Sequence, residues 1–194
     1  MPSSLNHYAR KVPFRWFAGA VAVIGLGVSS LFHGLAPVPA AETPTVKPGK
    51  VIDAGPWTIT VVDTRLLSSS TGLKTTTDGD HWFAIVATVD DTTNGSREDM
   101  GDIVRLSHVA GLTEAAPQRI LLTSDASTPR YLNPGMPERV AFLWEQSASA
   151  PLPTTAQIVI YGKTLRTNTL DATTDWLSPH VVADVTAPVL DKRT

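Results

Sequence analysis

The stretch that decides the fold is HWFAIVATVDD at residues 81–91. Its side chains alternate between two sets, as in a β-strand, and both sets are largely apolar: Phe83, Ile85, Ala87 and Val89 on one face, and Trp82, Ala84, Val86 and Thr88 on the other. Apolar residues on both faces are typical of a central strand that is covered on two sides. We therefore expect residues 81–91 to lie in the middle of a sheet.

Working outward, the rest of the chain after residue 42 is also typical of β-structure. Threonine is absent from residues 1–42 and occurs 24 times in the following 152, and β-branched residues at that density favour strands. Further strands are predicted at residues 57–67, Ile103–His108, Arg119–Thr123, Arg139–Glu145, Gln157–Tyr161 and Val181–Ala187, with a weaker one at Thr164–Thr169.

Turn signals separate these segments, and no convincing amphipathic helix follows residue 36. The turns are predicted at Thr77-Asp78-Gly79-Asp80, Thr93-Asn94-Gly95-Ser96, Asn133-Pro134-Gly135 and Tyr161-Gly162-Lys163. Short strands at this spacing predict an all-β fold, an antiparallel β-sandwich of seven to eight strands over residues 55–190, followed by a tail at 191–194. The core is predicted to contain Phe83, Ile85, Val89, Val140, Phe142, Trp144, Ile158 and Ile160.

The N-terminal part has a different chemistry. Residues 1–16 carry Arg10, Lys11 and Arg15 without an acidic residue, and residues 17–36 form an uncharged apolar run. Twenty helical residues span about 30 Å, the thickness of a bilayer's hydrocarbon core. Positive charge before the run places the N-terminus in the cytoplasm, so residues 17–36 are predicted to be one transmembrane helix or signal anchor.

A cleaved signal peptide is the alternative for this segment. Val38 and Ala40 are the small residues that signal peptidase prefers before a cleavage site, so the domain is secreted if the chain is cut near Ala40. Both interpretations place the sandwich outside the cytoplasm. Residues 37–54, with Pro37, Pro39, Pro44 and Pro48, are predicted to be an extended linker that enters neither a helix nor the centre of a sheet.

Composition excludes several classes of function. The chain has 194 residues with 16 basic and 18 acidic side chains, and a net charge of −2 is unlike the basic footprint of a nucleic-acid binder. The absence of cysteine excludes a disulfide scaffold, a thiolate zinc site and a thiol nucleophile. Gly-x-Ser-x-Gly and Ser-x-x-Lys motifs are also absent, so no catalytic residue, metal ligand or cofactor is assigned.

Two sets of residues remain as candidate contacts. Acidic side chains are dense in the predicted loops, where two loops at one end of the sandwich would present them to a partner or to calcium: Asp78, Asp80, Asp90, Asp91, Asp99 and Asp102. Trp176 has polar neighbours, unlike Trp57, Trp82 and Trp144 in apolar strands, and is a candidate for carbohydrate contact. His108 or His180 with an acidic partner is the residual possibility for a hydrolase.

Three segments carry a resemblance to a known family. They are WTITVVDTRLL (57–67), GDHWFAIVATVDD (79–91) and LNPGMPERVAFLWE (132–145). Together they resemble the immunoglobulin-like extracytoplasmic domains of unknown function on small bacterial single-pass membrane proteins and lipoproteins. The second segment ends in Asp90-Asp91, where that family often has an asparagine. The resemblance implies an immunoglobulin-like sandwich outside the membrane and no known reaction.

The sequence thus predicts a membrane-anchored, extracytoplasmic, non-catalytic binding or accessory module. Its expected partners are the membrane and another envelope protein, and the resemblance extends to proteins that accompany envelope transport or export systems. A secreted calcium- or carbohydrate-binding domain is the alternative.

Overall fold

Residues 81–91 form β4 (His81–Asp91), a central strand as predicted. A computed structural model describes residues 42–70, 72–169 and 172–193 of the chain. In it β4 pairs antiparallel with β3 (Trp57–Ser68) on one side and with β7 (Glu138–Gln146) on the other. Nine of its eleven residues are buried, which agrees with an apolar sequence on both faces.

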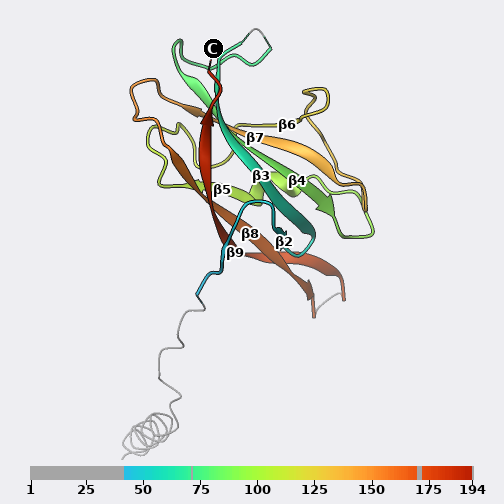
Figure 1. Ribbon diagram of the computed structural model, residues 1–194. Coiled ribbons are helices and arrows are strands. Elements are labelled where there is room, and N and C mark those ends of the chain that lie inside the picture. Colours follow the sequence, from blue (N-terminus) through green and yellow to red (C-terminus); the bar gives the residue numbers. More distant parts are fainter. Residues whose placement is uncertain (1–41, 71, 170–171, 194) are drawn as a thin grey trace, which may run out of the picture. The chain divides into compact units, whose positions relative to one another are not determined.

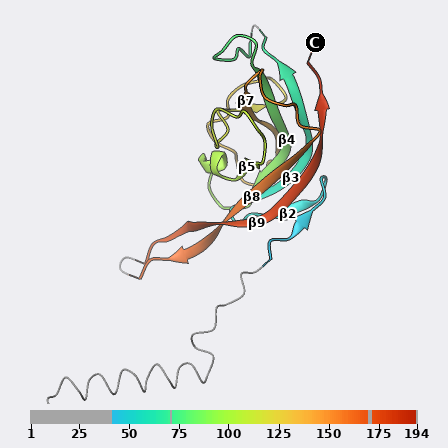
Figure 2. The same cartoon turned by 90° about the vertical axis from the view of Figure 1, so that its left-hand side faces the viewer.

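The described strands are arranged as a two-layer β-sandwich (Figures 1 and 2). The layer around β4 also contains two short strands, β2 (Val51–Asp53) and β6 (Arg119–Leu122). The second layer contains β1 (Thr45–Val46), β5 (Val104–Ser107), β8 (Thr155–Thr167) and β9 (Thr174–Asp191). A 3-10 helix, η1 (Asp99–Asp102), precedes β5.

The sandwich is not wholly antiparallel, contrary to the sequence-based expectation. Six of the eight strand pairings in the described residues are antiparallel, but β9 pairs in parallel with β1 and with β3. β9 reaches both layers because it is long: its 18 residues extend for about 60 Å at the usual rise of a strand. Its first fifteen residues, 174–188, run along β8, and its end, Val189–Asp191, pairs with Thr64–Leu66 of the other layer.

The predicted linker at residues 37–54 is wrong in its second half. Thr45–Val46 pairs with Asp184–Val185 of β9, and Val51–Asp53 pairs with Thr58–Thr60 of β3. These two strands raise the number of described strands to nine, and the compact unit begins at Thr43 instead of residue 55. Prolines lack an N–H donor, but Pro44 and Pro48 flank these strands without interrupting them.

Tyr161-Gly162-Lys163 is not a turn, because it lies inside β8. The register between β8 and β9 shifts on either side of Gly162, as at a β-bulge. A Cβ atom added to Gly162 would lie 2.7 Å from Cγ1 of Val182 and 3.1 Å from backbone atoms of Ala54. This glycine therefore permits close approach between strands and does not reverse the chain.

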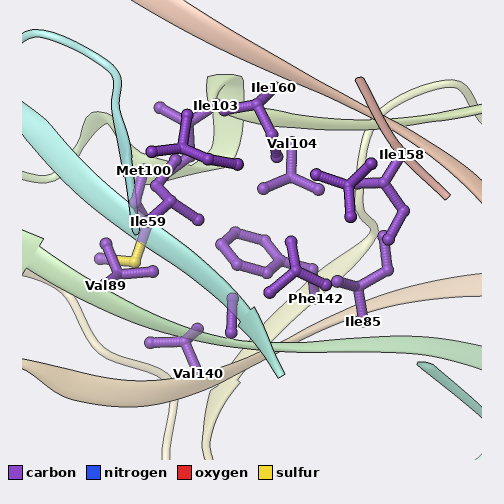
Figure 3. Close-up of a cluster of buried hydrophobic side chains, with 14 of the residues drawn as sticks. Ile59, Ile85, Val89, Met100, Ile103, Val104, Val140, Phe142, Ile158 and Ile160 are labelled. Carbon is purple, nitrogen blue, oxygen red and sulfur yellow. The ribbon is translucent and has the colours of Figure 1, made fainter. Parts of the chain in front are cut away.

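The core lies between the two layers (Figure 3). Phe142 sits among side chains from both layers, including Ile85 and Val140 from one side and Ile158 and Ile160 from the other. All eight predicted core residues have an exposed fraction of 0 %, which confirms that part of the prediction: Phe83, Ile85, Val89, Val140, Phe142, Trp144, Ile158 and Ile160. Trp57 and Trp82 are also buried.

The outer face of β4 is covered by a loop. Trp82, Ala84 and Leu143 form a second apolar cluster, against which Leu67, Leu73 and Leu121 pack. Residues 72–80, which we call the covering loop, are fixed there by two contacts. The indole N–H of Trp82 donates to the carbonyl oxygen of Leu73 (3.1 Å), and the buried Glu145 carboxylate accepts the backbone N–H groups of Thr76 and Thr77 (2.5 and 3.1 Å).

The predicted transmembrane segment, residues 17–36, lies outside the described residues. Within the part of the chain that the structure describes, no helix has the length and apolar character needed to cross a bilayer.

The core predicts the effect of truncating Phe142. Phe142→Ala should lower the free energy of unfolding by about 3–5 kcal/mol, because it leaves a cavity between the layers. Urea unfolding of the purified full-length protein, followed by tryptophan fluorescence, measures this change. Val62→Ala is the control, since Val62 is 37 % exposed, and should change stability by at most about 0.5 kcal/mol. Equal effects of the two substitutions would contradict the assignment of the core.

The bulge in β8 gives a second prediction. Gly162→Ala should destabilise the domain by about 1–3 kcal/mol, because the new methyl group crowds Val182 and Ala54. Gly95→Ala is the matched control, since nothing lies within 4 Å of a Cβ at Gly95. The same unfolding measurement applies, and an unchanged midpoint for Gly162→Ala would show that the neighbouring strands relax freely.

Candidate functional site

The structure separates the acidic residues that were expected to gather at one end of the sandwich. Asp78 and Asp80 precede β4, whereas Asp90 and Asp91 are its last two residues. The eleven residues of β4 span about 35 Å, so the two groups lie at opposite ends of the domain. The expectation of one shared acidic rim is therefore wrong, because a single strand runs from one loop to the other.

Two of these carboxylates hold local backbone structure. Oδ1 of Asp80 accepts the backbone N–H of Ala148 (2.9 Å). Asp91 is only 1 % exposed, and its Oδ1 accepts the backbone N–H and the hydroxyl of Thr93 (2.8 and 2.7 Å). Asp91 thus stabilises the turn after β4 and is not available as a surface contact.

The described residues contain no set of side chains that could form the alternative calcium site. In residues 42–70, 72–169 and 172–193, no group of three or more acidic or histidine side chains is close enough to hold a metal ion. Asp90 and Asp91 are neighbours in a strand and therefore point to opposite faces of the sheet. Asp102 pairs with Arg105 (3.2 Å).

The structure does bring together two other predicted residues, Asp99 and Trp176. They line one shallow depression with a volume of about 350 Å³ between the segment before β5 and the β8–β9 hairpin. Its remaining lining residues are Ser96, Arg97, Glu98, Lys163 and Asp175. We call this surface the Trp176 depression, and it is the candidate functional site.

An ion-pair cluster forms the floor of the Trp176 depression. The Arg97 guanidinium donates from Nε and Nη2 to the two carboxylate oxygens of Asp99 (2.9 and 2.8 Å). Nζ of Lys163, in β8, donates to Oδ2 of the same carboxylate (2.5 Å). The three side chains are 16–22 % exposed, so the cluster joins the η1 segment to β8 at a partly buried position.

The cluster fixes the charge of Asp99. Burial alone raises the pKa of the Asp99 carboxyl, but hydrogen bonds from Arg97 and Lys163, together with their positive charges, lower it to about 2. The hydrogen bond to Asp99 in turn raises the pKa of Arg97. Asp99 and Arg97 are therefore both charged at neutral pH.

Trp176 is held at the edge of this cluster by the packing of its strand. It lies in β9 directly opposite Leu165 of β8. The hairpin formed by these two strands projects from the body of the domain (Figure 2). Gly55 makes room for it, because a Cβ there would lie 2.8 Å from Cζ3 of Trp176 and would collide with the carbonyl oxygen of Lys163. Trp176 remains half-buried, and Leu165 is 51 % exposed.

Sequence reasoning missed Arg97, Lys163 and Gly55. Lys163 was assigned to a turn, and 64 residues separate it from Asp99. The available signal was the spacing of Arg97 and Asp99, which are two residues apart and form a bidentate pair. The partnership with Lys163 depends on the course of β8 and has no local signature.

The three histidines in the described residues lie in strands or directly after one: His81 in β4, His108 after β5 and His180 in β9. His81 is buried and its Nε2 is hydrogen-bonded to Oε1 of Gln146 (3.0 Å). His108 and His180 are exposed, and Nδ1 of His180 lies 3.1 Å from the carbonyl oxygen of Ser178. The structure thus places neither candidate hydrolase residue in the Trp176 depression.

No family model matches the sequence, and no curated protein matches it. Among solved structures, an uncharacterised β-sandwich protein from Clostridium difficile 630 is similar, with a TM-score of 0.44 and 10 % sequence identity. The match covers 77 % of this chain and 99 % of that chain.

The Asp99 cluster predicts a pH-dependent contribution to stability. The pKa of Asp99 falls from an ordinary 3.8 to about 2 on folding. A lowered pKa in the folded state stabilises the protein above the ordinary value, and this contribution is lost as pH falls from about 4 to 2. It amounts to about 2 kcal/mol at neutral pH.

Urea unfolding of the wild type and of Asp99→Asn at several pH values tests this contribution. The variant should be less stable by about 2 kcal/mol at pH 7, and the difference should shrink as the pH falls below about 4. Asp102→Asn is the control, since Asp102 is 63 % exposed in its ion pair and should contribute little. A difference between wild type and Asp99→Asn that is constant with pH would refute the electrostatic explanation.

Proposed function

We propose that this protein is a non-catalytic binding module, held outside the cytoplasmic membrane by a helix at residues 17–36, with the Trp176 depression as its binding surface. The observation that carries the proposal is the combination of a half-buried tryptophan with a fixed cluster of charged groups in one open depression. Aromatic and arginine side chains are enriched at the surfaces through which proteins recognise their partners.

The charge state of the cluster favours binding over catalysis. A general acid or base works best when its pKa lies near the operating pH. Asp99 has a pKa of about 2, and its two oxygens already accept hydrogen bonds from Arg97 and Lys163. Such a carboxylate holds its neighbours in fixed positions, which suits recognition of a ligand.

The position outside the cytoplasm is supported by the sequence alone. The support is the uncharged run at residues 17–36, the basic residues before it and the resemblance to immunoglobulin-like extracytoplasmic domains. We accordingly propose an immunoglobulin-like sandwich, on a single-pass protein that contacts an envelope component. Cleavage near Ala40 would yield the same domain as a secreted protein.

The absence of cysteine provides a clean test of this topology. Ser124→Cys introduces one thiol at an exposed position of the domain, and Ser4→Cys introduces one in the basic N-terminal segment. A membrane-impermeant maleimide added to intact spheroplasts should label the cysteine at position 124 at once and the cysteine at position 4 only after the membrane is permeabilised.

The same labelling experiment includes its own control and distinguishes the alternative topologies. The wild-type chain, which has no thiol, should stay unlabelled. Protection of the cysteine at position 124 in intact spheroplasts would disprove the proposed orientation. Recovery of a fragment that begins at Ala41 in the medium would replace the anchored form with the secreted one.

A further inference from the structure

We infer that the Trp176 depression binds a neutral carbohydrate, whose ring packs on Trp176 and whose hydroxyl groups bond to the surrounding polar side chains. This inference rests on the proposed function and names the ligand class of the same site. It follows from three properties of the depression: its aromatic surface, its mixture of donors and acceptors, and its balance of charge.

The first property is the accessibility of the tryptophan. Trp57, Trp82 and Trp144 are at most 2 % exposed, whereas Trp176 is half-buried and lines the depression. Its indole is backed by Gly55 and lies opposite Leu165 in the β8–β9 ladder. A pyranose ring has an apolar face of C–H groups, and such a face packs well on the flat surface of an indole.

The second property is the supply of hydrogen-bonding groups. Lys163 and Arg97 use only some of their N–H donors on Asp99, which leaves further donors on both side chains. Glu98 and Asp175 contribute acceptors to the same lining. Sugar hydroxyl groups both donate and accept, so they match a surface that carries both kinds of group.

The third property is charge. The lining contains two basic and three acidic side chains, so its net charge is −1, and both bases are bound to Asp99. A phosphorylated or sulfated ligand would meet the remaining carboxylates of Glu98 and Asp175 and would be repelled. Charge therefore favours a neutral ligand over an anionic one.

The size of the depression agrees with a small ligand. Its volume of about 350 Å³ lies at the lower end of the range for small-molecule sites, about 300–1,000 Å³. The floor is held rigid by the Asp99 cluster, so the ligand meets side chains that are already in place. Preorganisation of this kind lowers the entropic cost of binding.

The test is a screen of the full-length protein in phospholipid nanodiscs, which avoids detergents with sugar headgroups. Its probes are immobilised neutral oligosaccharides built from glucose, mannose, galactose, arabinose or N-acetylglucosamine, beside phosphorylated and sulfated counterparts. We expect binding to at least one neutral class and none to the anionic counterparts. Trp176→Ala should weaken this binding at least tenfold, and Trp176→Phe should retain part of it.

Tyr131→Ala is the matched control, because Tyr131 is an aromatic residue with 46 % exposure that does not line the depression. It should leave binding unchanged. The inference is overturned if no neutral oligosaccharide binds, or if Trp176→Ala binds as tightly as the wild type.

A second measurement separates this inference from the proposed function. A photocrosslinking amino acid at position 165, beside Trp176, is introduced into the protein in native membranes. A defined protein crosslinked there, lost in Trp176→Ala, together with a silent screen, would reject the carbohydrate and keep the binding module. A silent screen with no crosslink would reject both.

Discussion

The structure depends on the need to cover both faces of β4. A strand whose two faces are apolar is stable only when each face is removed from water, and the two faces of His81–Asp91 are covered in different ways. The inner face packs across the sandwich on β8 and β5. The outer face is covered by residues 72–80, which close over Trp82 because Glu145 binds two of their backbone N–H groups. The buried Glu145 carboxylate thus holds the covering loop in place over Trp82.

The two long strands of the second layer extend beyond the part that packs on β4. β8 and β9 have 13 and 18 residues, and their outer parts continue as a two-stranded hairpin beyond the body of the domain (Figure 1). An isolated two-stranded hairpin is marginally stable in water. At its base, Lys163 binds Asp99 and donates its backbone N–H to the carbonyl oxygen of Ala54 (3.1 Å). The candidate site therefore lies where the hairpin is tied to the rest of the sandwich.

The sequence predicted those features that local patterns determine. Alternation of apolar residues identified β4 and the core side chains around Phe142, because period-two burial is a property of a single strand. It did not reveal β1, whose two residues become a strand only through their pairing with Asp184 and Val185. Gly162 was misread for a related reason. A glycine that permits a turn and one that permits close approach look the same in a sequence, and only the position of Val182 distinguishes them.

The difference between local patterns and contacts of distant segments also explains which residues of the site could be predicted from the sequence. Asp99 and Trp176 were each singled out from their local surroundings, one for its acidic neighbours and the other for its polar ones. Their meeting in one depression results from the path of β9 back along β8, which sets Trp176 opposite Leu165, two residues from Lys163. Lys163 connects the two parts of the site. It lies in β8, one of the two strands of the hairpin, and it binds the carboxylate of Asp99 in η1. A substitution at Asp99 thus affects the hairpin through the Lys163 side chain, so the stability of the fold and the shape of the Trp176 depression are coupled at that residue.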